Sequence, residues 1–151
     1  MNYIFRSANK FDIDTIVDFT INEAYESQNT YIDLNMVIKG VSSAFESNPK
    51  SKYWVIEDME GNVIASTSVT TEFSDFYGKE YWWIQSFYIT QNNRGKNLSS
   101  FIISNLENEA KLQDVLELRL YVHHLNQRAI NAYVKNQFTP SQYIMMHKSI
   151  S

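Results

Sequence analysis

The sequence predicts a single domain, residues 1–151, of mixed α/β class. About six to seven strands should form its central sheet, with about four helices on the two faces. The first observation behind this is that segments with strand-like alternation are interspersed with segments of helical period. The second is composition: 44% of the residues are hydrophobic and 15% aromatic, which is ample for one core at this length. No repeat, low-complexity tract or obvious linker divides the chain.

The N-terminal third predicts one strand and two amphipathic helices. Residues 3–6 form the strand, and Asp12 can cap the first helix, whose apolar residues repeat at helical spacing through Tyr25. The second helix begins near Leu34. It ends before Pro49, because the residue that precedes a proline disfavours the helical conformation.

Three strands follow in the middle of the chain. Residues 53–56 and 63–71 are joined by a hairpin turn in which Gly61-Asn62 supplies positive φ. A loop over 72–79 leads to the third strand, residues 81–89, whose aromatic and β-branched residues suit a half-buried sheet.

The C-terminal third alternates between helix and strand. A helix is predicted from residue 96 to about residue 111, and residues 116–122 alternate as a strand. Asn126 opens a last helix, and residues 143–146 have the pattern of a closing strand. This alternation places helices on both faces of the sheet.

Residues 84–99 combine a strand, a polar turn and the start of a helix. A helix that begins between Gly95 and Leu98 directs its free backbone N–H groups and the positive end of its dipole toward the strand end, which forms an anion site. Arg94 and Lys96 add positive charge there, and Gly95 allows positive φ and a close backbone approach. The stretch therefore predicts a pyrophosphate site.

The segment Arg-Gly-Lys-Asn-Leu-Ser at 94–99 resembles motif A of the GNAT superfamily of N-acetyltransferases, with the signature Gln/Arg-x-x-Gly-x-Gly/Ala. Asn97 and Ser99 stand where that signature has glycine; asparagine tolerates left-handed backbone best among the other residues, and serine is small. The order of predicted elements matches the family across nearly the whole chain, and the strand at 81–89 is similar to that of a particular bacterial subgroup.

This resemblance implies a largely antiparallel sheet and acetyl-coenzyme A as the cofactor. It also implies that backbone amides of the strand hold the pantetheine arm and polarise the thioester carbonyl, Phe87 and Ile89 being the matching positions. The implied cofactor-binding residues on the strand and the turn are Phe87, Tyr88, Ile89, Arg94, Gly95, Lys96, Asn97, Leu98 and Ser99.

Residues 126–138 resemble motif B of the same family, with Gln137 in place of its glycine. The resemblance implies that Asn126 hydrogen-bonds the pantetheine or thioester region and that Tyr133 protonates the leaving thiolate. Asn126, Ala129 and Tyr133 fall on one helical face and can line one groove. The alternative for Tyr133 is a core aromatic residue of an amphipathic helix.

A general base is not evident on the strand at 81–89. Strand alternation puts Gln85 and Trp83 on the face of Phe87, and neither can be a base, although Gln85 could order a relay water. His123 has a suitable intrinsic pKa, but it fits equally well as a half-exposed residue at a strand end.

The acceptor is predicted to be a primary amine, from a small molecule, an aminoglycoside-like compound or a peptide. Glu72 and Asp75 could form an acidic rim that attracts a cationic amine, and Trp83 could supply an aromatic wall. Alternation places Trp82 and Trp83 on opposite faces. The alternative function is a non-catalytic module of the same fold that binds an acyl-coenzyme A.

Composition argues against several other functions. The net charge of −4 and the lack of a basic face disfavour nucleic-acid binding, and without cysteine there is no thiolate nucleophile or zinc-thiolate site. His123 and His124, adjacent at a strand end, should diverge, so no metal site is expected. No apolar run approaches the roughly 20 residues of a membrane span, and the N-terminus does not resemble a signal peptide. We therefore expect a cytoplasmic protein without membrane partners, and the resemblance makes a homodimer an expectation.

Overall fold

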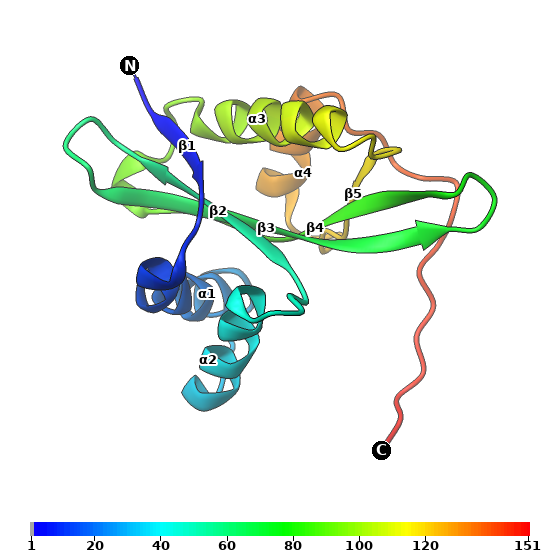
Figure 1. The fold of residues 1–151 in the computed structure, drawn as a ribbon, viewed down its shortest axis with the longest axis horizontal. Helices are drawn as coiled ribbons and strands as arrows, with labels where there is room; N and C mark the ends of the chain where they lie inside the picture. The colour runs from blue at the N-terminus through cyan, green and yellow to red at the C-terminus, as the bar shows by residue number, and fades with distance from the viewer. Residues whose placement is uncertain (1) are drawn as a thin grey trace. The chain divides into compact units, whose positions relative to one another are not determined.

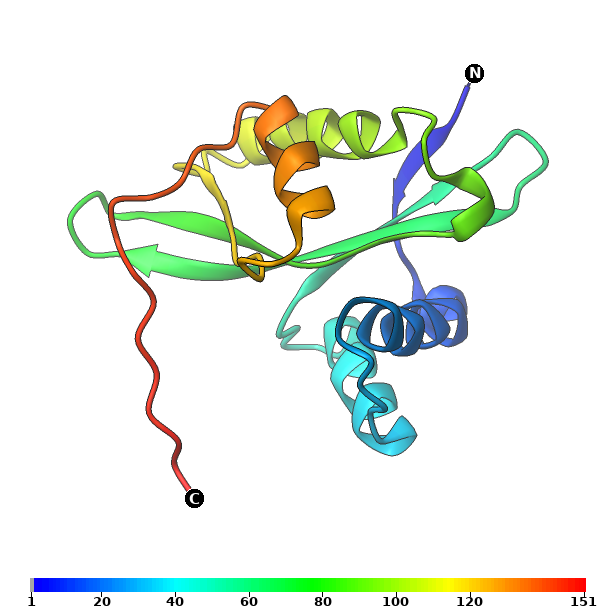
Figure 2. The same ribbon diagram turned by 180° about the vertical axis from the view of Figure 1, so that it is seen from behind.

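The computed structural model describes residues 2–151 and has the expected mixed α/β architecture (Figures 1 and 2). Two compact units are distinguished: one ends at Tyr121 and the other spans Val122–Ser151. The first contains β1 (Ile4–Ser7), α1 (Ile13–Gln28), α2 (Leu34–Ser42), β2 (Lys52–Glu57), β3 (Val63–Ser74), β4 (Lys79–Ile89), α3 (Leu98–Leu112) and β5 (Leu118–Leu120), with short 3-10 turns at Lys10–Asp12, Ser43–Phe45 and Gln91–Asn93. The second contains α4 (Gln127–Lys135).

The sheet is mixed and largely antiparallel, as the resemblance implies. Its strand order is β1-β2-β3-β4-β5; the first four strands are antiparallel neighbours, and β5 is parallel to β4. A parallel neighbour requires a crossover connection, which α3 supplies.

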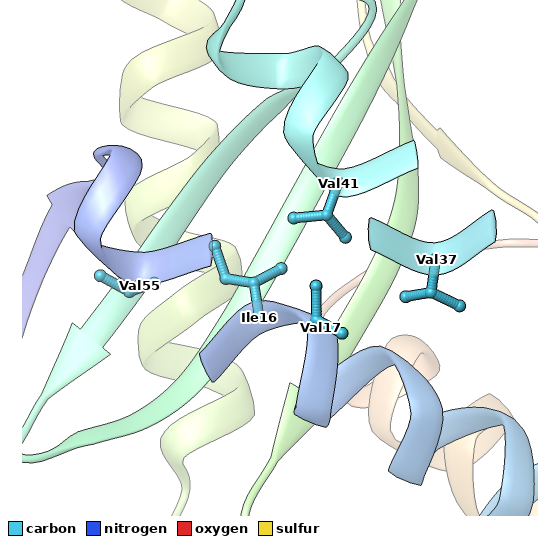
Figure 3. Close-up of a cluster of buried hydrophobic side chains, with 5 residues drawn as sticks. All are labelled: Ile16, Val17, Val37, Val41 and Val55. Atoms are coloured by element: carbon cyan, nitrogen blue, oxygen red, sulfur yellow. The ribbon is translucent and has the colours of Figure 1, made fainter. Parts of the chain in front are cut away.

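Helices cover both faces of this sheet (Figures 1 and 2). On one face, Val55 of β2 packs in a buried cluster with Ile16 and Val17 of α1 and Val37 and Val41 of α2 (Figure 3). Because side chains alternate along a strand, the neighbouring Trp54 points to the other face, the side of α3. There its ring lies 5.6 Å from the ring of Trp82.

A β-bulge in β4 changes which side chains share a face. Ser68 pairs with Ser86 and the next residue, Val69, pairs with Ile84, so Gln85 is an extra residue without a partner on β3. Before the bulge Trp82 lies on the face of Trp54; beyond it the ring of Tyr88 lies 5.1 Å from Phe19 of α1, on the opposite face. The expectation that Trp83 and Gln85 share the face of Phe87 is therefore wrong, because simple alternation does not continue through a bulge.

The number of strands is five in the described residues, fewer than the six to seven expected. Residues 143–146 do not form the closing strand: Tyr143, Ile144, Met145 and Met146 are all exposed. A strand needs a neighbour to accept its backbone hydrogen bonds, and the alternating pattern alone does not supply one. The strand expected over 116–122 is also shorter than predicted, since β5 ends at Leu120.

Two local expectations are also corrected. The carboxylate of Asp12 does not cap α1; it accepts hydrogen bonds from the guanidinium of Arg6 at 2.8 and 3.0 Å, which ties β1 to the helix start. The loop expected over 72–79 is limited to a turn over 75–78, because β3 continues to Ser74 and β4 begins at Lys79. In the described part of the chain, no helix combines the length and apolarity needed to cross a membrane.

Candidate functional site

The turn between β4 and α3 has the backbone geometry of an anion site. Gly95 has φ +76°, and Asn97, the residue before the helix, is left-handed with φ +60° and ψ +19°. The side chain of Asn97 makes no capping hydrogen bond to α3. Because the first N–H groups of a helix have no partners inside it, this helix start can accept an anion. Leu98 itself is buried, so its side chain anchors the turn while its backbone remains at the helix start.

Arg94 fixes this turn to the elements around it. Its Nε donates to the carbonyl oxygen of Ile89 at 2.8 Å, and its guanidinium forms an ion pair with Glu26 of α1 at 3.0 Å. The same guanidinium lies 5.3 Å from the centre of the Tyr88 ring. The side chain thus shapes the turn that the backbone of Gly95 to Ser99 follows.

The edge of β4 is open immediately before this turn. The pairing with β5 runs from Trp82 to Ile84 and stops there, because β5 ends at Leu120. The backbone N–H of Phe87 lies beyond the last pair, and it donates to Oε1 of Glu23 on α1 at 3.4 Å. The amide that the resemblance links to the thioester therefore sits beside a carboxylate.

Sequence reasoning missed Glu23. Burial raises the pKa of its carboxyl group to about 7, and the hydrogen bond from Phe87 opposes that rise. The signal was in the helical spacing: Glu23 follows Phe19 by four residues and Ile16 by seven, on the face of α1 that is buried.

A hydroxyl cluster lies beside Glu23 on the same face of the sheet. The hydroxyls of Ser68 and Ser86 are 2.6 Å apart, and the Tyr53 hydroxyl hydrogen-bonds both. Burial raises the pKa of Tyr53, and the charge of Glu23 raises it further. These groups form a connected polar layer between α1 and the strands β2 to β4.

A cavity of about 500 Å³ opens onto this layer. Glu23 and Thr20 line it from α1, Tyr53 from β2, and Gln85 and Ser86 from β4. Gln85, the bulged residue, lines this cavity. Phe87, which was expected on the same face as Gln85, does not line it. A smaller cavity of about 310 Å³, at the β3–β4 hairpin, shares none of these residues.

Two of the three residues expected to bind the acceptor lie together on the sheet. Nε1 of Trp83 donates to Glu72 at 2.9 Å. Arg119 of β5 lies 3.5 Å from the same carboxylate and 3.4 Å from the centre of the Tyr81 ring, so the charge of Glu72 is partly neutralised. Asp75, the third, lies in the turn after β3.

The motif B residues form the start and end of α4 in the second unit. Oδ1 of Asn126 accepts the N–H of Ala129 at 3.2 Å and caps the helix. Tyr133 is half-buried, with its ring edge-on to Phe138 at 5.5 Å. Gln137, at the glycine position of the motif, has φ +71°.

His123 lies in the turn before α4, where its Nδ1 accepts the N–H of Leu125 at 3.1 Å. The rings of His123 and His124 stack at 4.6 Å, so the expected divergence is wrong: these residues are in a turn and not in a strand. No group of three or more potential metal ligands occurs among the described residues.

Comparison with known proteins supports the sequence resemblance. A family model described as the acetyltransferase (GNAT) family matches residues 16–138. The fold is similar to that of a possible acetyltransferase from Clostridium difficile 630, with TM-score 0.92 and 27% identity, over 100% of this chain and 99% of the other. No curated protein matches the sequence.

Two more distant structures share the fold. One is a predicted acetyltransferase with acetyl-CoA from Clostridium acetobutylicum, with TM-score 0.78 and 16% identity over 97% of this chain and 96% of that one. The other is the ribosomal-protein-alanine N-acetyltransferase from Brucella melitensis biovar Abortus 2308, with TM-score 0.78 and 11% identity over 99% and 100% of the two chains.

The left-handed backbone at Asn97 predicts an unusual response to substitution. We expect Asn97→Ala to lower the free energy of unfolding by about 1 kcal/mol, because alanine is strained at φ +60°. Asn97→Gly should change it by less than about 0.5 kcal/mol, because glycine adopts this φ readily. Urea denaturation measures both. Asn108→Ala makes the same exchange at an exposed position of α3, where it should be neutral or slightly stabilising. Equal losses at the two sites would contradict the interpretation.

The raised pKa of Glu23 predicts that this residue lowers the stability of the fold at higher pH. The folded chain binds this proton more tightly than the unfolded chain does, so stability falls as pH rises from 4.5 to about 7. Glu23→Gln removes the ionisable group and therefore this loss of stability. The free energy of unfolding of the variant should exceed that of the unsubstituted protein by up to about 3 kcal/mol at pH 8 but not at pH 4.5. Urea denaturation at the two pH values tests this. The exposed Asp18→Asn on the same helix should show no such gain.

Proposed function

Because the chain belongs to the GNAT acetyltransferase family, we propose that it transfers the acetyl group of acetyl-coenzyme A to a primary amine. The amine attacks the thioester directly within a ternary complex, so no covalent enzyme intermediate forms, in keeping with the absence of cysteine. The observation that carries the proposal is the open edge of β4 at Phe87, next to the uncapped start of α3.

The proposed cofactor site follows from this arrangement. Backbone N–H groups of residues 95–99 bind the diphosphate, with the dipole of α3 and the charge of Lys96 in support. Arg94 holds the turn in shape through Ile89 and Glu26. The N–H of Phe87 donates to the thioester oxygen, where negative charge develops during attack.

The second unit contributes two proposed roles. The side-chain amide of Asn126 orients the pantetheine arm, with Ala129 on the same helix face. The hydroxyl of Tyr133 gives its proton to the thiolate when the carbon–sulfur bond breaks. Motif B supports these roles, and so does the left-handed Gln137, which has the backbone conformation that glycine adopts readily.

We place the acceptor on the face of the sheet that carries the larger cavity. Gln85, on the bulge, lines that cavity and can order a water there. The pair of Glu72 and Trp83 offers an acidic and aromatic surface that suits a cationic amine. We also propose a cytoplasmic homodimer without nucleic-acid partners. The family resemblance supports the dimer, and the net charge of −4 disfavours nucleic acid.

Acetyl-coenzyme A should raise the melting temperature of the protein, because a ligand at one hundred times its Kd adds about 2.7 kcal/mol of stability. S-acetylpantetheine, which lacks the diphosphate, is the matched control and should shift melting much less. Thiol release is then measured with a panel of primary amines. Absence of any shift at millimolar cofactor contradicts the proposal; a shift without thiol release from any amine indicates a non-catalytic acyl-coenzyme A module.

The proton donor is tested by Tyr133→Phe. We expect kcat to fall by roughly 10²-fold, the usual contribution of a general acid, with the KM for acetyl-coenzyme A little changed. Steady-state kinetics with the best amine of the panel provide the measurement. Tyr143→Phe removes the hydroxyl of an exposed tyrosine in the same unit and should retain full activity. A Tyr133→Phe enzyme as active as this control would exclude the acid role.

A further inference from the structure

We propose that Glu23 is the general base of the acetyl transfer and that the cavity beside it binds a small-molecule primary amine. This inference rests on the proposed function, and it assigns the proton acceptor that β4 lacks. It places the base on α1, in the lining of the same cavity that Gln85 of the bulge lines from β4.

Glu23 lies next to the proposed reaction site. The carboxylate of Glu23 lies 3.4 Å from the Phe87 N–H, the amide proposed to receive the thioester oxygen. An attacking nitrogen must come within about 3–3.5 Å of the thioester carbon. A base next to that amide is therefore within reach of the proton on the incoming amine.

The cavity lining contains few other charged or titratable groups. Among the described residues that line the cavity, Glu23 is the one carboxylate and Lys50, from the segment after α2, is the one cation. Tyr53 of β2 is the other titratable group of the lining, and its hydroxyl is held by Ser68 and Ser86. Glu26, one turn further along α1, forms an ion pair with Arg94.

Burial makes this carboxylate suited to the task. Its pKa of about 7 leaves it partly ionised near neutral pH, where a base of matched pKa is most effective. His123, the candidate base that the sequence offered, is exposed and belongs to the second unit.

The hydrogen bond from Phe87 couples the base to the cofactor. That bond lowers the pKa of Glu23. When the thioester oxygen takes the Phe87 N–H, the carboxylate loses this donor and becomes more basic, so cofactor binding near neutral pH is accompanied by proton uptake.

The proposed transfer begins with removal of a proton from the amine. Glu23 takes one proton from the ammonium group, and the freed nitrogen pair forms the carbon–nitrogen bond. The tetrahedral adduct collapses, the carbon–sulfur bond breaks and its electron pair leaves on sulfur. Tyr133 protonates the thiolate and recovers a proton from the nitrogen of the new amide, while Glu23 releases its proton to solvent.

The size and lining of the cavity indicate the class of acceptor. A volume of about 500 Å³ is typical of a small-molecule site. Hydroxyl groups of Thr20 and Thr70 and the amide of Gln85 line it with the apolar Ile32 and Val37. This lining suits a compact amine with hydrogen-bonding groups better than a protein tail.

Glu23→Gln tests the base without changing side-chain size. We expect kcat/KM for a small amine to fall 10²- to 10⁴-fold at pH 7, and the ionisation near pH 7 to disappear from the pH–rate profile. Glu23→Asp should keep that ionisation, and Asp18→Asn should keep both rate and profile. Thermal melts of each variant establish folding.

Calorimetry separates the base from a structural role. Titration of acetyl-coenzyme A at pH 7 in two buffers of different ionisation enthalpy should reveal proton uptake by the unsubstituted protein and none by Glu23→Gln, with both binding the cofactor. If Glu23→Gln keeps the rate and the profile, the inference is overturned while the proposed function stands. If the unsubstituted protein turns over no amine, the proposed function fails and the inference fails with it. Turnover of a lysine peptide but no small amine would overturn the acceptor assignment.

Discussion

The site depends on one constraint: β4 contains an extra residue at Gln85, and β5 stops one residue before it, opposite Ile84. The bulge reverses the faces of the following side chains, so Tyr88 packs on α1 while Trp82 packs on Trp54. The early end of β5 leaves the edge of β4 beyond Ile84 without a strand neighbour. A continuous ladder would use the Phe87 N–H within the sheet. A regular strand would turn Ser86 away from the cavity and put Phe87 on the cavity face with Trp83 and Gln85. The two departures from regularity thus leave the Phe87 N–H beyond the β5 ladder and bring Ser86 to the cavity.

The layer between α1 and the sheet changes character along its length. Around Val55 it is aliphatic, whereas around Ser86 it consists of hydroxyl groups and the carboxylate of Glu23. Within the described residues, no buried side-chain nitrogen or oxygen lacks a hydrogen-bond partner, so the polar part of the layer carries no unsatisfied buried group. An acid in this layer is disfavoured in its charged form, which is a cost to folding above neutral pH. Perturbed carboxylates of this kind are concentrated at functional sites, where the cost accompanies a chemical role.

Much of the fold was predictable from sequence because its elements have strong local signals. Periodicity placed α1, α2 and α3 within a few residues, and the family motif located the turn at Arg94 to Ser99. Tertiary features were not predictable in the same way. The bulge at Gln85 leaves the strand pattern intact and shifts only the pairing, so alternation wrongly put Phe87 on the face of Trp83 and Gln85. Helical spacing puts Glu23 on the buried face of α1, but only the packing of α1 on the sheet brings this carboxylate to Phe87. The strand expected at 143–146 had the right pattern but no neighbour in the structure.

The departures from the family motifs are informative about what those motifs require. Asn97 and Gln137 replace glycines, and both residues have positive φ, at +60° and +71°. The backbone conformation that glycine adopts freely is therefore kept at each position, at a modest cost in strain. Arg94, the cation at the start of the motif, donates to the carbonyl oxygen of Ile89 and forms an ion pair with Glu26. Here the motif residues act on backbone shape: the side chain of Arg94 holds the turn that leads into α3.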